Sequence, residues 1–472
     1  MTLNEYMQAA TDAGMSVQVG STPVYGNLTL GGIFATSAHG SGDRTISSLA
    51  DTVSEIVWID GTGAVRRSAR DSDEGRALSG GLGLTGVVTE LVLQLTPPTH
   101  TQLITRYLSS DASMLQDLDA MLKVSPHILV FWRPDQGLYS AFMVRPVDTS
   151  VPTDGDPYMT LLPNFAGRVS QAKAFQFFQE DVYNELYPVP EMQYQYSCPT
   201  VAYNSVVKTW ASSADGSPVL DVVGRTNRMQ VCECGQDCPW NSPVYNGTAE
   251  DVELTMEYEH LPSWLDDMRA VIARDLKEDG AQPGRCMGPG YIWLRFGRGT
   301  DDNIATFSGM KRPVFVQSTW LKSRAAPGFA QRYGYVLDLL EQVTLCKYKG
   351  RPHWGKNHDR TFVHPGCPVR DLYPKFDEAV AMAKKYDPLG MFEPALFARV
   401  KGAAEGEGAM PAFPRCALSR KCYCSEDAHC EDGHACVPSL ALPEFKVCKP
   451  DKAGRAAAKA KAAAEAKAAK AA

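Results

Sequence analysis

Residues 25–42 hold side chains and glycines whose types and spacing suggest chemistry. The stretch reads YGNLTLGGIFATSAHGSG and places five glycines and several small residues around a single histidine, His39. Because glycine has no Cβ, such a chain can bring its backbone N–H groups directly against a flat or anionic ligand. Leu30, Ile33 and Phe34 would anchor the stretch on a core. A histidine beside a glycine is also common in structural turns, so this stretch alone leaves the role of His39 open.

A second glycine cluster runs into a predicted strand. Residues 79–95 read SGGLGLTGVVTELVLQL, and Gly81, Gly83 and Gly86 form a Gly-x-Gly-x-x-Gly pattern. In dinucleotide-binding βαβ units this pattern opens a helix, whereas here an alternating strand follows. The cluster therefore does not predict that kind of unit.

Two basic side chains lie in aromatic surroundings further along the chain. Arg295 lies within YIWLRF at 291–296, and Lys356 ends RPHWGK at 351–356. A fixed cation can stabilise negative charge that develops on a cofactor or substrate. The two-residue period of a strand would direct Arg295 and Trp293 to one face. An ordinary surface ion pair is the alternative for Arg295.

The elements that would position these residues follow from apolar spacing and turn signals. Helices are predicted at 2–13, 113–122, 263–273 and 372–383, and strands at 53–59, 64–68, 89–95, 128–132, 253–258 and 291–296. Tandem prolines at 97–98 break the strand pattern and mark the end of a first domain. The mixture predicts an α+β fold.

Four segments together resemble the aldonolactone oxidase branch of the vanillyl-alcohol-oxidase-type flavoproteins, which includes gulonolactone, galactonolactone and arabinonolactone oxidases. They are the loop at 25–42, the glycine segment with its strand at 81–89, the strand at 291–296, and HWGK at 353–356 with DPLGMF downstream. The third segment departs from the family. Where lactone oxidases carry Glu-x-Arg, this chain has Trp293 and Arg295.

The resemblance implies FAD as the cofactor and no metal. It implies a partial PCMH-type FAD-binding domain, an α/β cap domain and a C-terminal disulfide-rich module. Lys356 and Arg295 would be catalytic. The implied cofactor-binding residues are Gly31, Gly32, Thr36, His39, Gly40, Gly42, Gly83, Gly86, Val87, Val88 and His353.

The implied reaction is the oxidation of a sugar-1,4-lactone to ascorbate or an analogue, with O2 or another electron acceptor. The lactone would be L-gulono-, L-galactono- or D-arabinono-1,4-lactone. Two alternatives remain open at this point. One is an FAD-linked oxidase of another sugar or polyol, because the glutamate of Glu-x-Arg is absent. The other is a noncatalytic secreted protein whose Cys-rich module binds a protein or glycan partner.

The predicted domain limits follow the shifts in composition. They are the second half of an FAD-binding domain at 1–97, a cap domain at 98–348, a segment returning to the flavin at 349–400, a linker at 401–415, a Cys-rich module at 416–448 and an Ala/Lys-rich tail at 449–472. Members of the family begin with a strand and a phosphate-binding loop. The match here starts at the helix after that loop, so we expect the chain to be N-terminally incomplete relative to its family.

Cysteines are unusually frequent, with 13 in 472 residues. The six at 416–448 predict three disulfides in a small module, although their spacing leaves the pairing open. A zinc site that uses His434 is the alternative. The loop at 230–248 holds three more cysteines and the sequon at Asn246, which predicts a disulfide-braced loop with one glycosylation site, or else a metal site.

The totals exclude some classes of function. A net charge of −7 argues against general nucleic-acid binding. The chain holds no uninterrupted apolar run of about 18 residues, so no transmembrane helix is predicted. The cysteines favour the secretory pathway or the extracellular space, with a signal peptide expected upstream of residue 1, and membrane association is the alternative.

Overall fold

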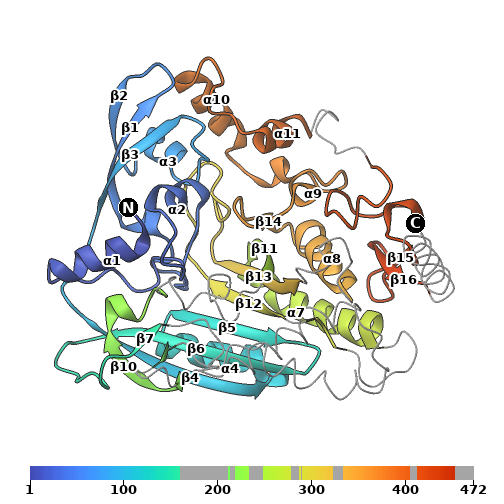
Figure 1. Cartoon of the computed structure of the whole chain (residues 1–472), viewed down its shortest axis with the longest axis horizontal. Helices are drawn as coiled ribbons and strands as arrows, with labels where there is room; N and C mark the ends of the chain where they lie inside the picture. Colours follow the sequence, from blue (N-terminus) through green and yellow to red (C-terminus); the bar gives the residue numbers. More distant parts are fainter. Residues whose placement is uncertain are drawn as a thin grey trace, which may run out of the picture.

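Two antiparallel sheets organise the part of the chain that the structure describes (Figure 1). The structure is a computed structural model, and it describes residues 1–159, 211–212, 218–232, 248–277, 286–288, 290–322, 333–403 and 412–451. The smaller sheet has the order β2-β1-β3, and the larger has the order β10-β4-β6-β5-β12-β13-β11-β14. This is the predicted α+β fold.

The N-terminal part follows the sequence pattern closely. Helix α1 (Leu3–Asp12) begins with a capping box in which Thr2 and Glu5 bond each other's backbone N–H groups. The predicted hairpin is formed by β1 (Val53–Asp60) and β2 (Val65–Ala69), and β3 (Gly86–Leu93) pairs with β1. One difference lies in the first glycine stretch, which contains helix α2 (Leu30–Thr36) instead of an open loop.

The larger sheet has two different faces, because alternate residues of each strand point to opposite sides. Ile128, Val130 and Trp132 lie in the core beneath the helices, whereas Leu129 and Phe131 face residues near the glycine stretch. Its strands are β4 (His100–Ser110), β5 (His127–Arg133), β6 (Leu138–Val147), β10 (Val222–Arg225), β11 (Thr248–Glu257), β12 (Gly290–Phe296), β13 (Pro313–Lys322) and β14 (Arg351–Pro352).

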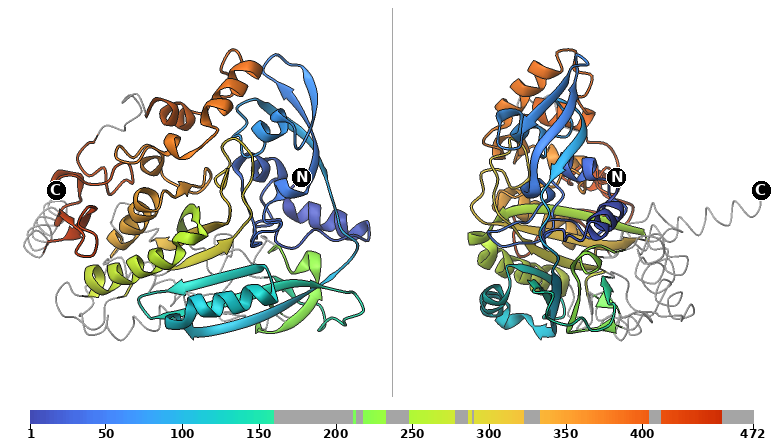
Figure 2. Two further views of the ribbon diagram at one scale, coloured as in Figure 1. Left: turned by 180° about the vertical axis from the view of Figure 1, so that it is seen from behind. Right: turned by 90° about the vertical axis from the view of Figure 1, so that its left-hand side faces the viewer.

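Helices cover the first of these faces, as Figures 1 and 2 show. They are α4 (Met114–Val124), α7 (Leu261–Ala270) and α8 (Tyr335–Gln342), and the last two continue as the π-helical segments Val271–Lys277 and Val343–Lys347. The remaining described elements are α3 (Asp73–Leu78), β7 (Tyr158–Met159), β8 (Ala211–Ser212), β9 (Pro218–Val219), α9 (Asp359–Phe362), α10 (Phe376–Tyr386) and α11 (Ala395–Ala403). Helix α11 runs into the stretch expected to be a linker.

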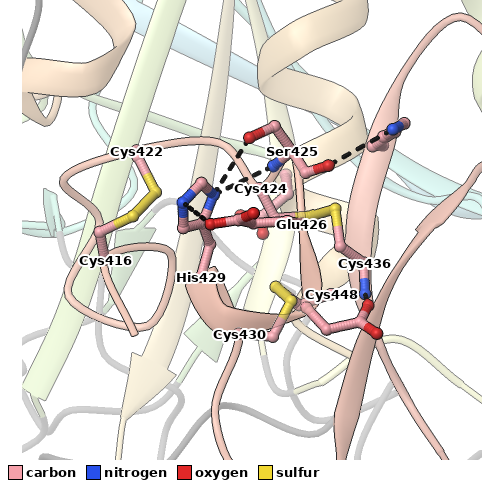
Figure 3. Close-up of a disulfide and its surroundings, with 12 residues drawn as sticks. Cys416, Cys422, Cys424, Ser425, Glu426, His429, Cys430, Cys436 and Cys448 are labelled. Atoms are coloured by element: carbon pink, nitrogen blue, oxygen red, sulfur yellow. Dashed lines mark hydrogen bonds and ion pairs between the residues drawn. A yellow bond between two sulfur atoms is a disulfide. The ribbon is translucent and has the colours of Figure 1, made fainter. Parts of the chain in front are cut away.

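The Cys-rich module contains the strands β15 (His434–Pro438) and β16 (Lys446–Pro450). Its six cysteines form the three predicted disulfides, drawn in Figure 3, and a fourth links Cys346 to Cys367. The three pairs in the module are Cys416–Cys422, Cys424–Cys436 and Cys430–Cys448. The module packs directly against α8.

Some expectations fall outside the described residues. These are the sequon at Asn246, most of the Cys-rich loop around it, and most of the Ala/Lys-rich tail. None of the described helices combines the length and apolarity needed to cross a bilayer. The predicted domain limits stay predictions.

Candidate active site

A buried row of side chains crosses three neighbouring strands of the larger sheet. Trp293 on β12 pairs in register with Gln317 on β13, and Gln317 pairs with Glu253 on β11. Arg295 follows Trp293 by two residues and therefore points to the same face. All four side chains are at most 2% exposed. The register of the strands thus brings an arginine, a carboxylate and an amide together inside the protein.

Glu253 is the centre of this group, because three donors reach its carboxylate. His39 Nε2 lies 2.7 Å from Oε1, Lys356 Nζ lies 2.9 Å from Oε2, and Arg295 Nη2 also bonds Oε2. Burial by itself would raise the pKa of Glu253. The charges of Lys356 and Arg295 outweigh that effect and hold the pKa well below its ordinary value. Glu253 is therefore a carboxylate at neutral pH.

The two cations share a second acceptor. Gln317 Oε1 accepts hydrogen bonds from Arg295 Nη2 at 2.8 Å and from Lys356 Nζ at 2.7 Å. Arg295 also donates from Nη1 to the carbonyl of His39 at 3.0 Å, and its guanidinium lies 4.3 Å from the centre of the Trp293 ring. With both histidines neutral, the two cations and Glu253 carry a net charge of +1. We call Glu253, Arg295, Gln317 and Lys356 the ion cluster.

Lys356 reaches the cluster from a tight turn that is fixed to β11. The backbone N–H of His353 donates to the carbonyl of Glu253 at 2.9 Å, and the side-chain amide of Asn357 donates to the same carbonyl at 2.7 Å. Trp354 anchors the turn in the core, where its ring stacks on other aromatic rings. Burial and Arg295 lower the pKa of Lys356, although Glu253 opposes them.

The two predicted histidines lie next to the cluster, and both are neutral at pH 7. Burial lowers the pKa of His39 to about 4 in spite of Glu253, and its ring stacks on Phe315 at 3.4 Å between centroids. Burial lowers the pKa of His353 to about 3. His353 Nδ1 accepts from the N–H of Gly355 at 3.0 Å, so Nε2 carries the proton. That buried N–H meets no acceptor among the described residues.

The backbone of the His-Gly turn does not present free N–H groups as expected. The N–H of Gly40 donates to the carbonyl of Ser47 at 2.7 Å, and that of Gly42 donates to the carbonyl of Phe296 at 2.7 Å. A Cβ on Gly40 would lie 2.2 Å from the carbonyl oxygen of Gly20. Close backbone packing therefore explains this glycine. Contrary to the prediction, the N–H groups of Gly40 and Gly42 are bonded within the protein and do not face a ligand.

The other predicted cofactor residues lie together at α2 and not in the ion cluster. The second glycine cluster packs on the end of α2, where Gly80 N–H donates to the carbonyl of Phe34 at 2.8 Å and Leu82 N–H to that of Ala35 at 2.9 Å. The predicted cofactor residues are Gly31, Gly32 and Thr36 within α2, Gly83 in the turn between α3 and β3, and Gly86, Val87 and Val88 in β3. Two glycine motifs that are separate in the sequence are thus joined by backbone hydrogen bonds.

A small cavity of about 40 Å³ adjoins the ion cluster. Its walls are mainly apolar, and two buried polar atoms on residues that line it, Thr22 Oγ1 and Arg295 Nε, have no partner among the described residues. The cation, the unpartnered polar groups and the apolar walls suit contact with the edge of a flavin ring system, whereas the space itself is smaller than the roughly 300 Å³ of an ordinary ligand pocket. The lining residues are Val19, Gly20, Thr22, Val24, Gly40, Ser41, His127, Leu129, Val144, Met229, Gln230 and Arg295.

Sequence reasoning missed Glu253 and Gln317. The signal was a carboxylate between Val252 and Leu254 at the start of a predicted strand, because such a residue faces the side opposite to its apolar neighbours. A charged side chain there indicates either an exposed face or a buried partner. One sequence does not decide between these two cases.

Two family profiles match parts of the chain. The profile of D-arabinono-1,4-lactone oxidase matches residues 325–400, which include the Lys356 turn. The profile of the L-gulonolactone oxidase 2-like C-terminal domain matches residues 413–450, which form the Cys-rich module. Both profiles describe enzymes of the aldonolactone oxidase branch, and their positions along the chain support the predicted resemblance to that branch.

Relatives of this branch cover nearly the whole chain. The probable L-gulonolactone oxidase 6 of Arabidopsis thaliana is 24% identical over 474 residues, which span 95% of this chain and 74% of the relative. L-gulonolactone oxidase 2 of the same plant is 24% identical over 95% of this chain and 76% of its own length. The branch consists of FAD-dependent oxidoreductases.

Solved structures support the fold. A solvent-stable cholesterol oxidase superposes with a TM-score of 0.60 at 16% identity over 85% of this chain and 80% of its own. The cholesterol oxidase from B. sterolicum gives a TM-score of 0.60 at 14% identity over 84% and 79%. At these identities the similarity concerns the fold alone.

Proposed function

We propose that the chain oxidises a sugar-1,4-lactone with FAD as its cofactor and passes the electrons to O2 or another acceptor. L-gulono-, L-galactono- and D-arabinono-1,4-lactone are the substrates to test, and ascorbate or an analogue would be the product. The relatives named as L-gulonolactone oxidases and the profile over residues 325–400 support this proposal.

The observation that carries the proposal is the ion cluster beside the apolar cavity. Two cations are held by one buried carboxylate, so the cluster keeps a net positive charge where negative charge would develop during oxidation. Their hydrogen bonds to Glu253 and Gln317 fix both cations before the reaction. Such preorganised charge stabilises a transition state without the cost of reorienting water.

Residues of the chain would contact the cofactor and hold the two cations in place. The chemistry that FAD would supply when bound is hydride acceptance from the lactone. Arg295 and Thr22 line the cavity and would contact the ring system, and the buried Nε2–H of His353 would donate to an oxygen of a bound group. Glu253 does not act as a base near pH 7, because its lowered pKa leaves it a weak proton acceptor. Its role is to hold Arg295 and Lys356 in place.

The test replaces the lysine in flavin-loaded protein. Flavin absorbance on purification comes first, since a noncatalytic binding protein would lack it. Anaerobic reduction of the flavin by each lactone is then followed by stopped flow, with polyols as comparison substrates. Lys356→Met should slow reduction by about 100-fold, as the loss of one charge-stabilising group does elsewhere.

Two further variants sharpen the test. Lys123→Met removes an exposed lysine at the end of α4 and serves as the matched control, which we expect to react like the wild type. Lys356→Arg keeps the charge and should recover part of the rate. If Lys356→Met reduces its flavin at the wild-type rate, the proposed role of the ion cluster is wrong.

A further inference from the structure

The Cys-rich module packs into the main hydrophobic core. Leu442, Phe445 and Val447 belong to the same buried cluster as the larger sheet and its helices. Lys449 Nζ lies 2.6 Å from Asp275, at the end of the helical segment after α7, and both side chains are buried. Figure 3 shows the three disulfides that stiffen the module. Its position relative to α8 is therefore fixed.

The module also contacts a buried arginine that lies outside it, in α9. Arg360 in α9 is 2% exposed and donates from Nη2 to Asp338 and to Glu341, each at 2.7 Å. Tyr423 of the module covers it, with the guanidinium 4.4 Å from the ring centre, and the Tyr423 hydroxyl bonds Glu341 at 3.0 Å. The module thus closes one side of the Arg360 site.

A second module residue ties two separate elements together. Arg420 forms ion pairs with Asp338 on α8 and, at 3.2 Å, with Glu250 on β11. The side chains of these three residues are at most 13% exposed. Arg420 and Arg360 therefore share Asp338, and a loss of Arg420 would leave Glu250 and Asp338 with less compensation for their buried charge.

Both ends of this network lead to the ion cluster. Glu250 precedes Glu253 by three residues on the same strand, and Arg360 follows Lys356 by four residues, directly after its turn. We propose that the disulfide-rich module is a positioning element which, through Arg420 and Tyr423, holds the Lys356 turn against β11. The catalytic role of Lys356 in this inference rests on the proposed function. The position of its turn against β11 does not.

The test measures the position of Lys356 without turnover. The full chain, with any FAD it retains, is pulsed with acetic anhydride at several pH values, and acetylation of Lys356 is compared with that of Lys123 by mass spectrometry. Hydrogen–deuterium exchange of residues 351–363 is recorded in parallel. Because breaking a buried ion pair is strongly destabilising, Arg420→Met should raise both rates by about tenfold or more. Lys446→Met removes an exposed module lysine and is the matched control.

Each outcome bears on the proposal. An increase confined to 351–363 and the Lys356 amine in Arg420→Met, with Lys446→Met unchanged, supports it. Unchanged rates in Arg420→Met overturn it, and so does an equal increase throughout the chain, since that would show a general loss of stability. If Arg420→Met does not fold, Arg420→Lys replaces it under the same criteria. No arm needs a lactone, so a failed lactone assay leaves this result interpretable.

Discussion

Replacing Glu253 by glutamine tests the centre of the ion cluster. The substitution keeps size and one acceptor oxygen but removes the charge that three donors share. Arg295 would then be a buried cation whose nearest side-chain acceptors are neutral. Breaking a buried ion pair by removing one partner costs about 3–5 kcal/mol. Because the Lys356 side chain is 19% exposed and water can partly compensate it, we expect the lower end, about 3 kcal/mol.

The same substitution should change the pH dependence of flavin reduction. Because the proposed role of Lys356 requires its positive charge, activity should be lost as pH rises through its pKa, which burial already lowers. Glu253 opposes this lowering, and its removal should shift the alkaline limb to still lower pH. The stability difference has its own pH window. Since the pKa of Glu253 is depressed in the folded chain, its contribution is complete above the ordinary glutamate pKa and is lost as pH falls through the folded value.

Two measurements check these expectations. Urea unfolding at pH 7 gives the stability difference, and stopped-flow flavin reduction between pH 6 and pH 10 gives the alkaline limb. Glu259→Gln, an exposed carboxylate just beyond β11, is the matched control and should behave like the wild type. A Glu253→Gln chain that keeps wild-type stability and an unmoved alkaline limb would refute the argument that Glu253 holds the cations.

Two further predictions concern stability. Because His39 is neutral in the fold with a pKa of about 4, against about 6.5 when unfolded, its own contribution to stability should fall by up to about 1.4 kcal/mol per pH unit as pH drops from 6.5 towards 4. Urea unfolding at pH 7, 6 and 5 measures this slope, and His39→Gln should make it shallower. The bond between Cys346 and Cys367, 21 residues apart, encloses the Lys356 turn, and the double alanine variant should lose about 3 kcal/mol of unfolding free energy. An equal stability of that variant and the wild type would contradict the loop-closure argument.

The sequence predicted the cations of the site but not what holds them. Arg295 and Lys356 stand in recognisable motifs, and their strand and turn could be placed from alternation and apolar spacing. Glu253 could not be assigned, because its role depends on the pairing of β11 with β13 and of β13 with β12. Register over such distances is set by the whole sheet and cannot be derived from one short pattern.

The glycines illustrate the opposite case, in which the pattern was visible but its cause was not. A glycine beside His39 is compatible with contact to a ligand or with contact to another backbone. In the structure Gly40 lies against the backbone of Gly20, and its N–H is already bonded to Ser47. Both causes require the absence of a Cβ, so composition alone does not distinguish them.

The register of β11, β13 and β12 gives a physical reason for the departure from Glu-x-Arg at position 293. A glutamate at position 293 would give the cluster two carboxylates for its two cations. Trp293 instead places an aromatic face on the guanidinium of Arg295, and the carboxylate comes from Glu253 in the same row of the sheet. The aromatic ring holds the arginine without neutralising it. The cluster therefore keeps one more positive charge than a Glu-x-Arg strand would leave it, which favours an anionic group in the adjoining cavity.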